Sequence, residues 1–206
     1  MAKTIPIIIS NNCVLVRDND TMEFKPFTIP TVDIPNVPFY HQYAEKIAET
    51  QVQFKEFIKK LYGKKTSKFI LAIIVPDDTT ALESIFINEF FLNSGACKAV
   101  AQTTMGQALQ ADNTRYISLS KSTRCIILQY ICKGEVLAKK YYDSDFTDSN
   151  IIKEDAKRLH IDIEYAVVPI YVNNFNLNME DFEKLGDVIS PKDFLDKIAN
   201  IDVEKV

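Results

Sequence analysis

The segment from Lys68 to Leu109 limits the possible folds more than any other part of this chain. It opens with Phe69–Val75, an uninterrupted apolar run that is typical of a central strand covered by helices on both faces. A proline ends the run, a helical pattern follows, and Ala96–Ala101 reads as a second short strand. A further helix, capped at Thr103 or Thr104, is expected to run to about residue 111. Strand, helix, strand and helix in this order predict an α/β fold.

The helix between these two strands carries its own start and stop signals. Thr80 and Glu83 have the spacing of a capping box, and Gly95 is the residue type that commonly follows the end of a helix. The helix is apolar on two sides, which indicates either deep burial or a surface for a partner protein. One side carries Leu82, Ile85, Phe86 and Glu89, and the other carries Ile87, Phe90 and Phe91. Burial is the simpler interpretation; if a partner protein binds this helix, we expect Ile87, Phe90 and Phe91 to contact it.

The chain before this segment predicts a meander of three short strands. They are expected over Ile5–Ser10, Cys13–Arg17 and Thr21–Phe27, separated by turns rich in Asn and Asp. Three prolines exclude regular structure from Ile29–Phe39, which we interpret as an extended connector. Apolar residues at helical spacing then predict a helix over Tyr40–Leu61.

The chain after Asp112–Asn113 repeats this order of elements. Strands are predicted over Arg115–Ser120, Arg124–Cys132, Glu135–Tyr142 and Ile163–Val172. Helices are predicted over Asn150–His160, Met179–Leu185 and Pro191–Ile201. Each half therefore reads strand, strand, strand, helix, strand, helix.

This doubled order resembles the actin-like ATPase fold, which duplicates a ribonuclease-H-like unit. The residues that carry the resemblance are Ile74–Pro76, Asn93–Ala96 and Gln102–Ala108. They are similar to a segment of MreB, FtsA and the heat-shock chaperone ATPases that reads roughly VP, AGA and EPxAAA. Ile163–Asn174 stands where those proteins have a strand that ends in paired glycines. The resemblance implies two half-domains, residues 1–112 and 113–206, each a mixed sheet flanked by helices, without the family's small insertion subdomains.

The resemblance also points to three loops that hold the nucleotide in the family. There, an Asp and a Gly-Thr stretch follow the first strand, an Asp and several glycines open the second half, and paired glycines hold the adenosine. The matching positions here are Asn11 and Asn12, then Lys121, Ser122 and Thr123, then Asn173 and Asn174. Glycine lets the backbone approach a phosphate closely, and carboxylates hold magnesium. None of the five glycines falls in these loops; they are at 63, 95, 106, 134 and 186.

Gln102 stands where the family places the residue that orients the attacking water, which is Glu or Gln. An ordinary capping role at the start of a helix is the simpler explanation. Lys121 is suited to face a phosphate, and Ser122 and Thr123 are suited to donate hydrogen bonds to one. No carboxylate stands beside them to hold magnesium.

We therefore expect a non-catalytic actin-like scaffold or protein-binding module that assembles with itself or with a protein partner, with no cofactor and no metal. The alternative is a residual ATP-binding protein or phosphotransferase of the actin-like and sugar-kinase superfamily. It needs an acid near the phosphates, and Asp77 and Asp78, like Asp18 and Asp20, are candidates, although the first pair is better explained as helix caps. A ribonuclease-H-type nuclease needs clustered carboxylates on its first strand, and Ile5–Ser10 has none.

Composition narrows the class of partner. The net charge of −4 and the pI of about 5.3 argue against nucleic acid, which usually binds a basic face. The lysines over residues 59–68 allow a local basic patch, although a solvated helix end is the simpler explanation. The four cysteines show no CxxC spacing and suit reduced thiols, and a zinc site is not expected. With no signal sequence and no membrane span evident, we expect a cytoplasmic protein.

Overall fold

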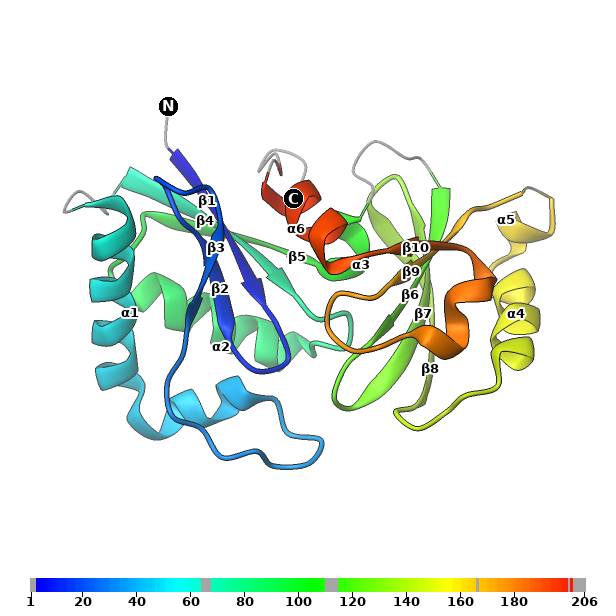
Figure 1. Cartoon of the computed structure of the whole chain (residues 1–206), viewed down its shortest axis with the longest axis horizontal. Helices are drawn as coiled ribbons and strands as arrows, with labels where there is room; N and C mark the ends of the chain where they lie inside the picture. Colours follow the sequence, from blue (N-terminus) through cyan, green and yellow to red (C-terminus); the bar gives the residue numbers. More distant parts are fainter. Residues whose placement is uncertain (1–2, 64–67, 110–114, 166, 200, 202–206) are drawn as a thin grey trace. The chain divides into compact units, whose positions relative to one another are not determined.

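The computed structural model describes residues 3–63, 68–109, 115–165, 167–199 and 201. The described residues form two compact units, one of residues up to Thr104 together with Ala199 and Ile201, and one within Met105–Ile198 (Figure 1). The boundary expected at residues 112 and 113 lies outside the described residues. Within the described ranges, no helix is both long enough and apolar enough to cross a bilayer.

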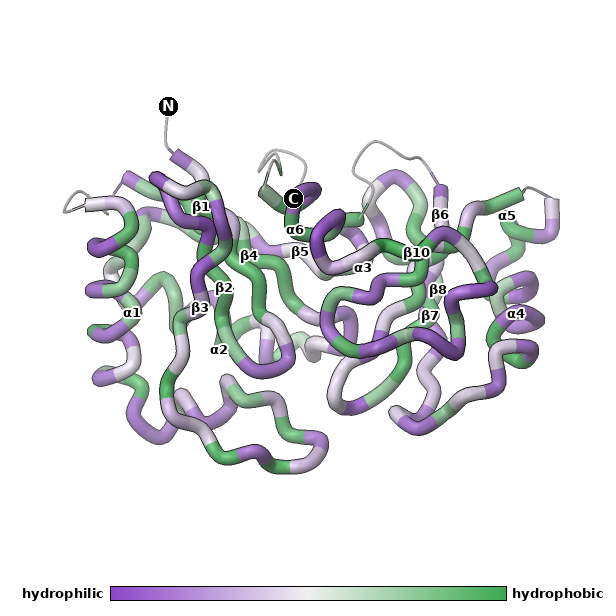
Figure 2. The backbone as a smooth tube through the Cα atoms, viewed as in Figure 1, coloured by the Kyte–Doolittle hydropathy of each residue, from purple (hydrophilic) through white to green (hydrophobic). Residues whose placement is uncertain are grey.

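The first unit is built on a mixed sheet of five strands in the order β3-β2-β1-β4-β5. The strands are β1 (Lys3–Ile9), β2 (Val14–Arg17), β3 (Phe24–Phe27), β4 (Phe69–Val75) and β5 (Ala99–Thr104). The first three form the predicted antiparallel meander, while β4 pairs parallel with β1 and β5 pairs parallel with β4. Both central strands, β1 and β4, are apolar along most of their length, and they are the buried middle of the sheet (Figure 2).

Two helices pack against one face of this sheet. They are α1 (Ile47–Tyr62) and α2 (Ala81–Asn93), and they bury an aromatic cluster against β1, β2 and β4. Phe54 of α1 lies edge-on to Phe91 of α2, with ring centroids 4.8 Å apart. Burial of each such ring contributes about 1.5–3 kcal/mol, so this cluster fixes α2 on the sheet.

The helix predicted over residues 40–61 is two elements. A 3-10 helix, η1 (Phe39–Lys46), precedes α1, and the backbone of Lys46 departs from helical geometry between them. The Gln42 side chain bonds both the amide and the carbonyl of Val32, at 2.8 and 2.7 Å, and so ties η1 to the proline-rich connector. Gly63 ends α1 with a φ of 81°, as its place in the sequence predicted.

The second unit repeats the sheet, in the order β10-β9-β6-β7-β8. Its strands are β6 (Arg115–Lys121), β7 (Cys125–Cys132), β8 (Glu135–Asp143), β9 (Ile170–Asn173) and β10 (Asp187–Ile189). Again three strands form an antiparallel meander, and the next two are parallel to the first. Its helices are α3 (Met105–Ala108), α4 (Ser149–Arg158), α5 (Ile161–Glu164), η3 (Glu180–Leu185) and α6 (Pro191–Ala199). The core on one face joins α4 and the η3 region to the sheet.

In the second unit the sequence misplaced one strand and missed another. The strand predicted over 163–172 begins only at Ile170, because His160 caps a short helix, α5, by accepting from the amide of Asp162. The three-residue strand β10 was missed. The helix predicted to be capped at Thr103 or Thr104 begins at Met105 as α3 and ends at Ala108, and residues 110 and 111 lie outside the described residues. Gly186, just before β10, passes so close to β9 that an added Cβ would lie 2.1 Å from the carbonyl oxygen of Ile170.

Candidate functional site

The turn between β1 and β2 is closed by its own serine. The Ser10 hydroxyl accepts from the amides of Asn12 and Cys13, at 3.4 and 3.2 Å, and donates to the Cys13 carbonyl at 2.9 Å. The Ser10 amide also donates to that carbonyl, at 3.0 Å. An oxygen of the chain therefore occupies the place to which these turn amides point.

The turn between β6 and β7 has the same arrangement. The Ser122 hydroxyl accepts from the amides of Arg124 and Cys125, at 3.0 and 3.2 Å, and donates to the Cys125 carbonyl at 3.4 Å. Ser122 is 4% exposed, so this oxygen lies in the interior of the turn. The two turns share a Ser-x-x-Cys pattern, a residue-level repeat that the prediction from sequence missed although the letters show it.

The segment that leaves β9 is also closed by side chains. The Asn173 carbonyl oxygen Oδ1 accepts from the amide of Phe175 at 3.1 Å, and that of Asn174 accepts from the amide of Met179 at 3.0 Å. Asn173 is 3% exposed. Both asparagines thus hold the turn that leads into η3.

Gln102 lies within β5, in register with Ile73, and not at the start of a helix. The capping role that the sequence indicated for it is therefore wrong. Its Nε2 atom is buried and has no hydrogen-bond partner among the described residues. Lys121 is the last residue of β6, in register with Ile126, and Thr123 is exposed in the turn that follows.

Among the carboxylates considered for an enzyme, Asp18 stabilises its own turn, while Asp77 and Asp78 are not the caps of α2, because Thr80 holds that position. Asp18 accepts from the amides of Asp20 and Thr21, at 2.7 and 3.4 Å, and these bonds lower its pKa. Asp77, at the end of β4, is 2% exposed. Among the described residues, no three His, Cys, Asp or Glu side chains are grouped so that they could hold a metal ion.

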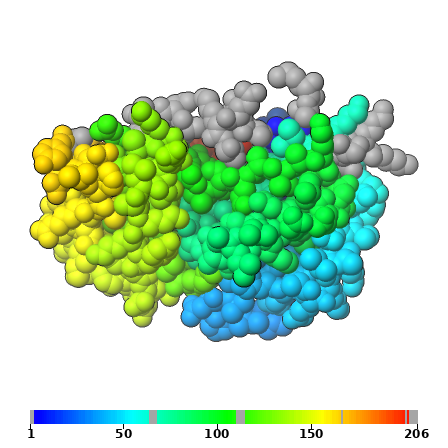
Figure 3. Space-filling view, turned by 180° about the vertical axis from the view of Figure 1, so that it is seen from behind, coloured from blue at the N-terminus to red at the C-terminus, as the bar shows by residue number. Residues whose placement is uncertain are grey.

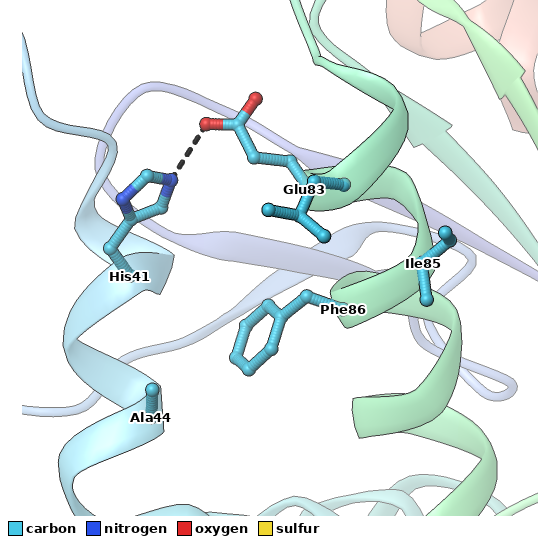
Figure 4. Close-up of a pocket in the computed structure, with 6 residues that line it drawn as sticks. His41, Ala44, Glu83, Ile85 and Phe86 are labelled. Carbon is cyan, nitrogen blue, oxygen red and sulfur yellow. Dashed lines mark hydrogen bonds and ion pairs between the residues drawn. The ribbon is translucent and has the colours of Figure 1, made fainter.

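A groove of about 420 Å³ lies between η1 and α2 in the first unit (Figure 4). We define the η1–α2 groove by its lining residues, which are His41, Ala44, Leu82, Glu83, Ile85 and Phe86. Most of the lining is aliphatic or aromatic. Leu82 is 77% exposed and Ile85 is 59% exposed, values that are high for aliphatic side chains on a well-packed helix.

One hydrogen bond joins the two walls of the groove. The His41 Nε2 lies 2.7 Å from the Glu83 Oε1. The other oxygen of Glu83 accepts from the amide of Thr80 at 2.8 Å, while the Thr80 hydroxyl accepts from the Glu83 amide at 3.2 Å. This is the capping box that the sequence predicted. Glu83 therefore fixes both the first turn of α2 and its distance from η1.

Burial, the simpler interpretation of Ile87, Phe90 and Phe91, is what the structure shows. Ile87 and Phe90 are 2% exposed and Phe91 is 1% exposed, because this side of the helix packs on the sheet. The exposed apolar side is the other one, with Leu82 and Ile85. Both sides are apolar, so periodicity alone gave no reason to choose between them.

No protein-family model and no curated protein matches this sequence. Solved structures do match its fold. A putative N-acetylglucosamine kinase from Porphyromonas gingivalis has a TM-score of 0.60 at 9% identity, over 96% of this chain and 99% of that one. The ethanolamine utilization protein EutJ from Carboxydothermus hydrogenoformans has a TM-score of 0.55 at 12% identity, over 95% and 87%.

AlfA, in the filament structure from B. subtilis plasmid pLS32, has a TM-score of 0.52 at 11% identity, over 95% of this chain and 97% of that one. A second AlfA filament, bound to AMPPNP, has a TM-score of 0.52 at 12% identity, over 97% and 95%. The chain thus has the actin-like ATPase fold, with a ribonuclease-H-like sheet in each unit, as the sequence predicted.

Proposed function

We propose that this chain is a non-catalytic protein-binding scaffold, which uses the actin-like fold to assemble with a protein partner or with itself and does not hold a nucleotide. One observation carries the proposal: the loops that match the family's nucleotide-holding loops are filled by their own side chains. Ser10 and Ser122 accept from the amides of the two hairpin turns. Asn173 and Asn174 do the same after β9.

Phosphate recognition by a loop depends on backbone amides that point at the anion and on a metal that neutralises it. A hydrogen bond to a charged group contributes about 1.5–3 kcal/mol. A loop whose amides are already bonded within the chain therefore loses much of its affinity for a phosphate. The four turn amides that donate to Ser10 and Ser122 would have to leave these partners before they could contact a phosphate. These hydrogen bonds support a chain that has the actin-like fold but does not bind a nucleotide.

The alternative function is a residual ATP-binding protein or a phosphotransferase. The similarity in fold to the putative sugar kinase favours it, while the similarity to the AlfA filaments favours self-assembly. At such low sequence identities, the similarity supports a shared fold only. We therefore prefer the scaffold to the phosphotransferase because of the hydrogen bonds within the loops. The acidic net charge of −4 supports a protein partner over nucleic acid.

We propose that the protein is cytoplasmic, and the chemistry of its cysteines supports this. All four are free thiols, and burial raises the pKa of Cys97 to about 11, which keeps that thiol protonated and unreactive.

The test is phosphate release from ATP by the full-length chain with magnesium, with light scattering recorded on the same samples. We expect no release above the buffer rate and scattering that is independent of ATP. Magnesium-dependent release in proportion to protein concentration would show that the chain binds and hydrolyses ATP, and would overturn the non-catalytic scaffold.

A further inference from the structure

We propose that Ser118 and Gln129 bind one water molecule in the interior of the second unit. This site lies outside the loops on which the proposed scaffold function rests. Both side chains are 0% exposed. The Ser118 Oγ atom and the Gln129 Oε1 and Nε2 atoms have no hydrogen-bond partner among the described residues. Neither side chain contributes to the surface of the second unit, one side of which is seen from behind in Figure 3.

The two residues lie opposite each other on neighbouring strands. Ser118 of β6 is in register with Gln129 of β7, so both side chains point to the same face of the sheet. Leu119 and Leu128, the adjacent residues on these strands, belong to the core on the other face. The pair is therefore separate from that core.

The face that carries the pair is covered by α3. The Tyr116 hydroxyl, on the same side of β6 as Ser118, donates to the Gly106 carbonyl of α3 at 2.9 Å. Three further side chains on this face are those of Ser120, Ile127 and Ile131. None of the side chains on this face bonds to Ser118 or Gln129. The polar atoms of the pair are thus buried among groups that do not satisfy them.

The three polar atoms match a water molecule in number and in type. A buried polar group that loses its bonds to water and gains no other destabilises the fold, so burial of the pair without a ligand is unfavourable. The Ser118 hydroxyl can donate or accept, the Gln129 Oε1 accepts, and the Gln129 Nε2 donates. One water donates two hydrogen bonds and accepts two, and an internal water typically makes about three. A single water can therefore bond to all three atoms.

The spacing of the strands favours a bridging water over a direct bond. The Ser122 amide donates to the Cys125 carbonyl at 2.9 Å, so these residues form a hydrogen-bonded pair of the antiparallel ladder. Such pairs alternate along the ladder, so Ser118 and Gln129, four residues further along each strand, form one too. Their Cα atoms are then about 5.5 Å apart, compared with about 4.5 Å in the other kind of pair. Two hydrogen bonds through one water span about 5.5 Å.

The first test compares Ser118→Ala, Gln129→Met and the double variant of the full-length chain with the wild type by circular dichroism, which also checks that each variant is folded. Each single substitution should lower the Tm by about 2–4 °C, because it leaves polar atoms of the other residue short of a partner. The double variant should melt above either single variant, since it removes the water together with every side-chain group that needs it.

Ser190→Ala is the matched control, because Ser190 lies in the same unit and accepts from the Asp193 amide at 3.2 Å. Its effect on the Tm should add to that of Gln129→Met when the two are combined. A higher Tm in both single variants would show that Ser118 and Gln129 are buried without a ligand. Full additivity between Ser118→Ala and Gln129→Met would show that they share none. Either result would overturn the proposal.

The second test is a crystal structure of the wild type at a resolution that shows ordered waters, which decides the question even if a variant does not fold. We expect one water within about 3 Å of the Ser118 Oγ and of the Gln129 side-chain amide. A direct bond between the two side chains, with no water between them, would overturn the proposal whatever the melting temperatures. Neither test involves nucleotide or a partner protein, so failure here and failure of the scaffold function in the phosphate-release assay are distinguishable.

Discussion

Replacing the serine of each hairpin turn by alanine should destabilise the protein, and by different amounts in the two turns. Ser122 is 4% exposed and accepts from two amides at 3.0 and 3.2 Å, so Ser122→Ala leaves two donors without their acceptor in a dry site. At about 1 kcal/mol per lost bond, the free energy of unfolding should fall by about 2 kcal/mol. Ser10 accepts over 3.2 and 3.4 Å in a half-exposed turn, where water can replace the hydroxyl, and Ser10→Ala should cost about 1 kcal/mol.

The assay is thermal unfolding of the full chain followed by circular dichroism. For a chain of this size, Ser122→Ala should lower the Tm by about 4–8 °C and Ser10→Ala by about half as much. Ser10→Thr and Ser122→Thr keep the hydroxyl and serve as matched controls, and at the half-exposed Ser10 the Tm should stay near that of the wild type. If both alanine variants have the Tm of the wild type, the serines do not stabilise the turns. The proposal that these serines prevent the loops from binding phosphate would then be wrong.

Other predictions concern parts of the fold that position the groove and the sheets. Thr80→Ala removes half of the capping box and should cost about 1 kcal/mol in urea unfolding, whereas Thr80→Ser should not. Gly186→Ala places a Cβ 2.1 Å from the backbone oxygen of Ile170 and should cost about 1–3 kcal/mol; a wild-type midpoint would mean that β10 moves freely. Hydrogen bonds from Lys140 and from the Tyr142 hydroxyl to Asp155 lower its pKa below 3.8, so its stabilisation is present above that pH and is lost as the pH falls through the folded pKa. Below about pH 4, the free energy of unfolding of Asp155→Asn should therefore depend less on pH than that of the wild type. The difference should be less than about 1 kcal/mol, because Lys140 is half-exposed. The same pH dependence in both proteins would contradict this.

Apolar runs bounded by clear turn signals predicted the sheets well. The strand over Phe69–Val75 matches β4 residue for residue, because a run that is apolar on both faces has few alternatives to the centre of an α/β sheet. The predicted strands also occur in the predicted order in each half, apart from β10, which was missed, and this order carried the fold assignment. Short elements that depend on tertiary contacts were not predictable in this way. β10 is three residues long and exists because Gly186 lets it approach β9.

The candidate site was harder to predict from the sequence than the fold. The absence of glycine from the three loops was plain, but the serine bonds that close two of them depend on hairpin geometry. On α2, the sheet decides which of two apolar sides is buried, and it covers Ile87 and Phe90 while Leu82 and Ile85 stay exposed. Neither result follows from composition or periodicity, since both sides of the helix have similar apolar content.

The central claim, that the fold persists in this chain without a nucleotide site, is tested most directly by the melting temperature of the full-length chain with and without millimolar Mg-ATP. A ligand that binds the folded state raises its stability by mass action, by about 2.7 kcal/mol at one hundred times its Kd. We predict a Tm that Mg-ATP leaves within about 1 °C of the value in buffer, since such binding would shift it by several degrees. A rise of several degrees that is removed by EDTA would show that Mg-ATP binds the folded protein and would contradict the account.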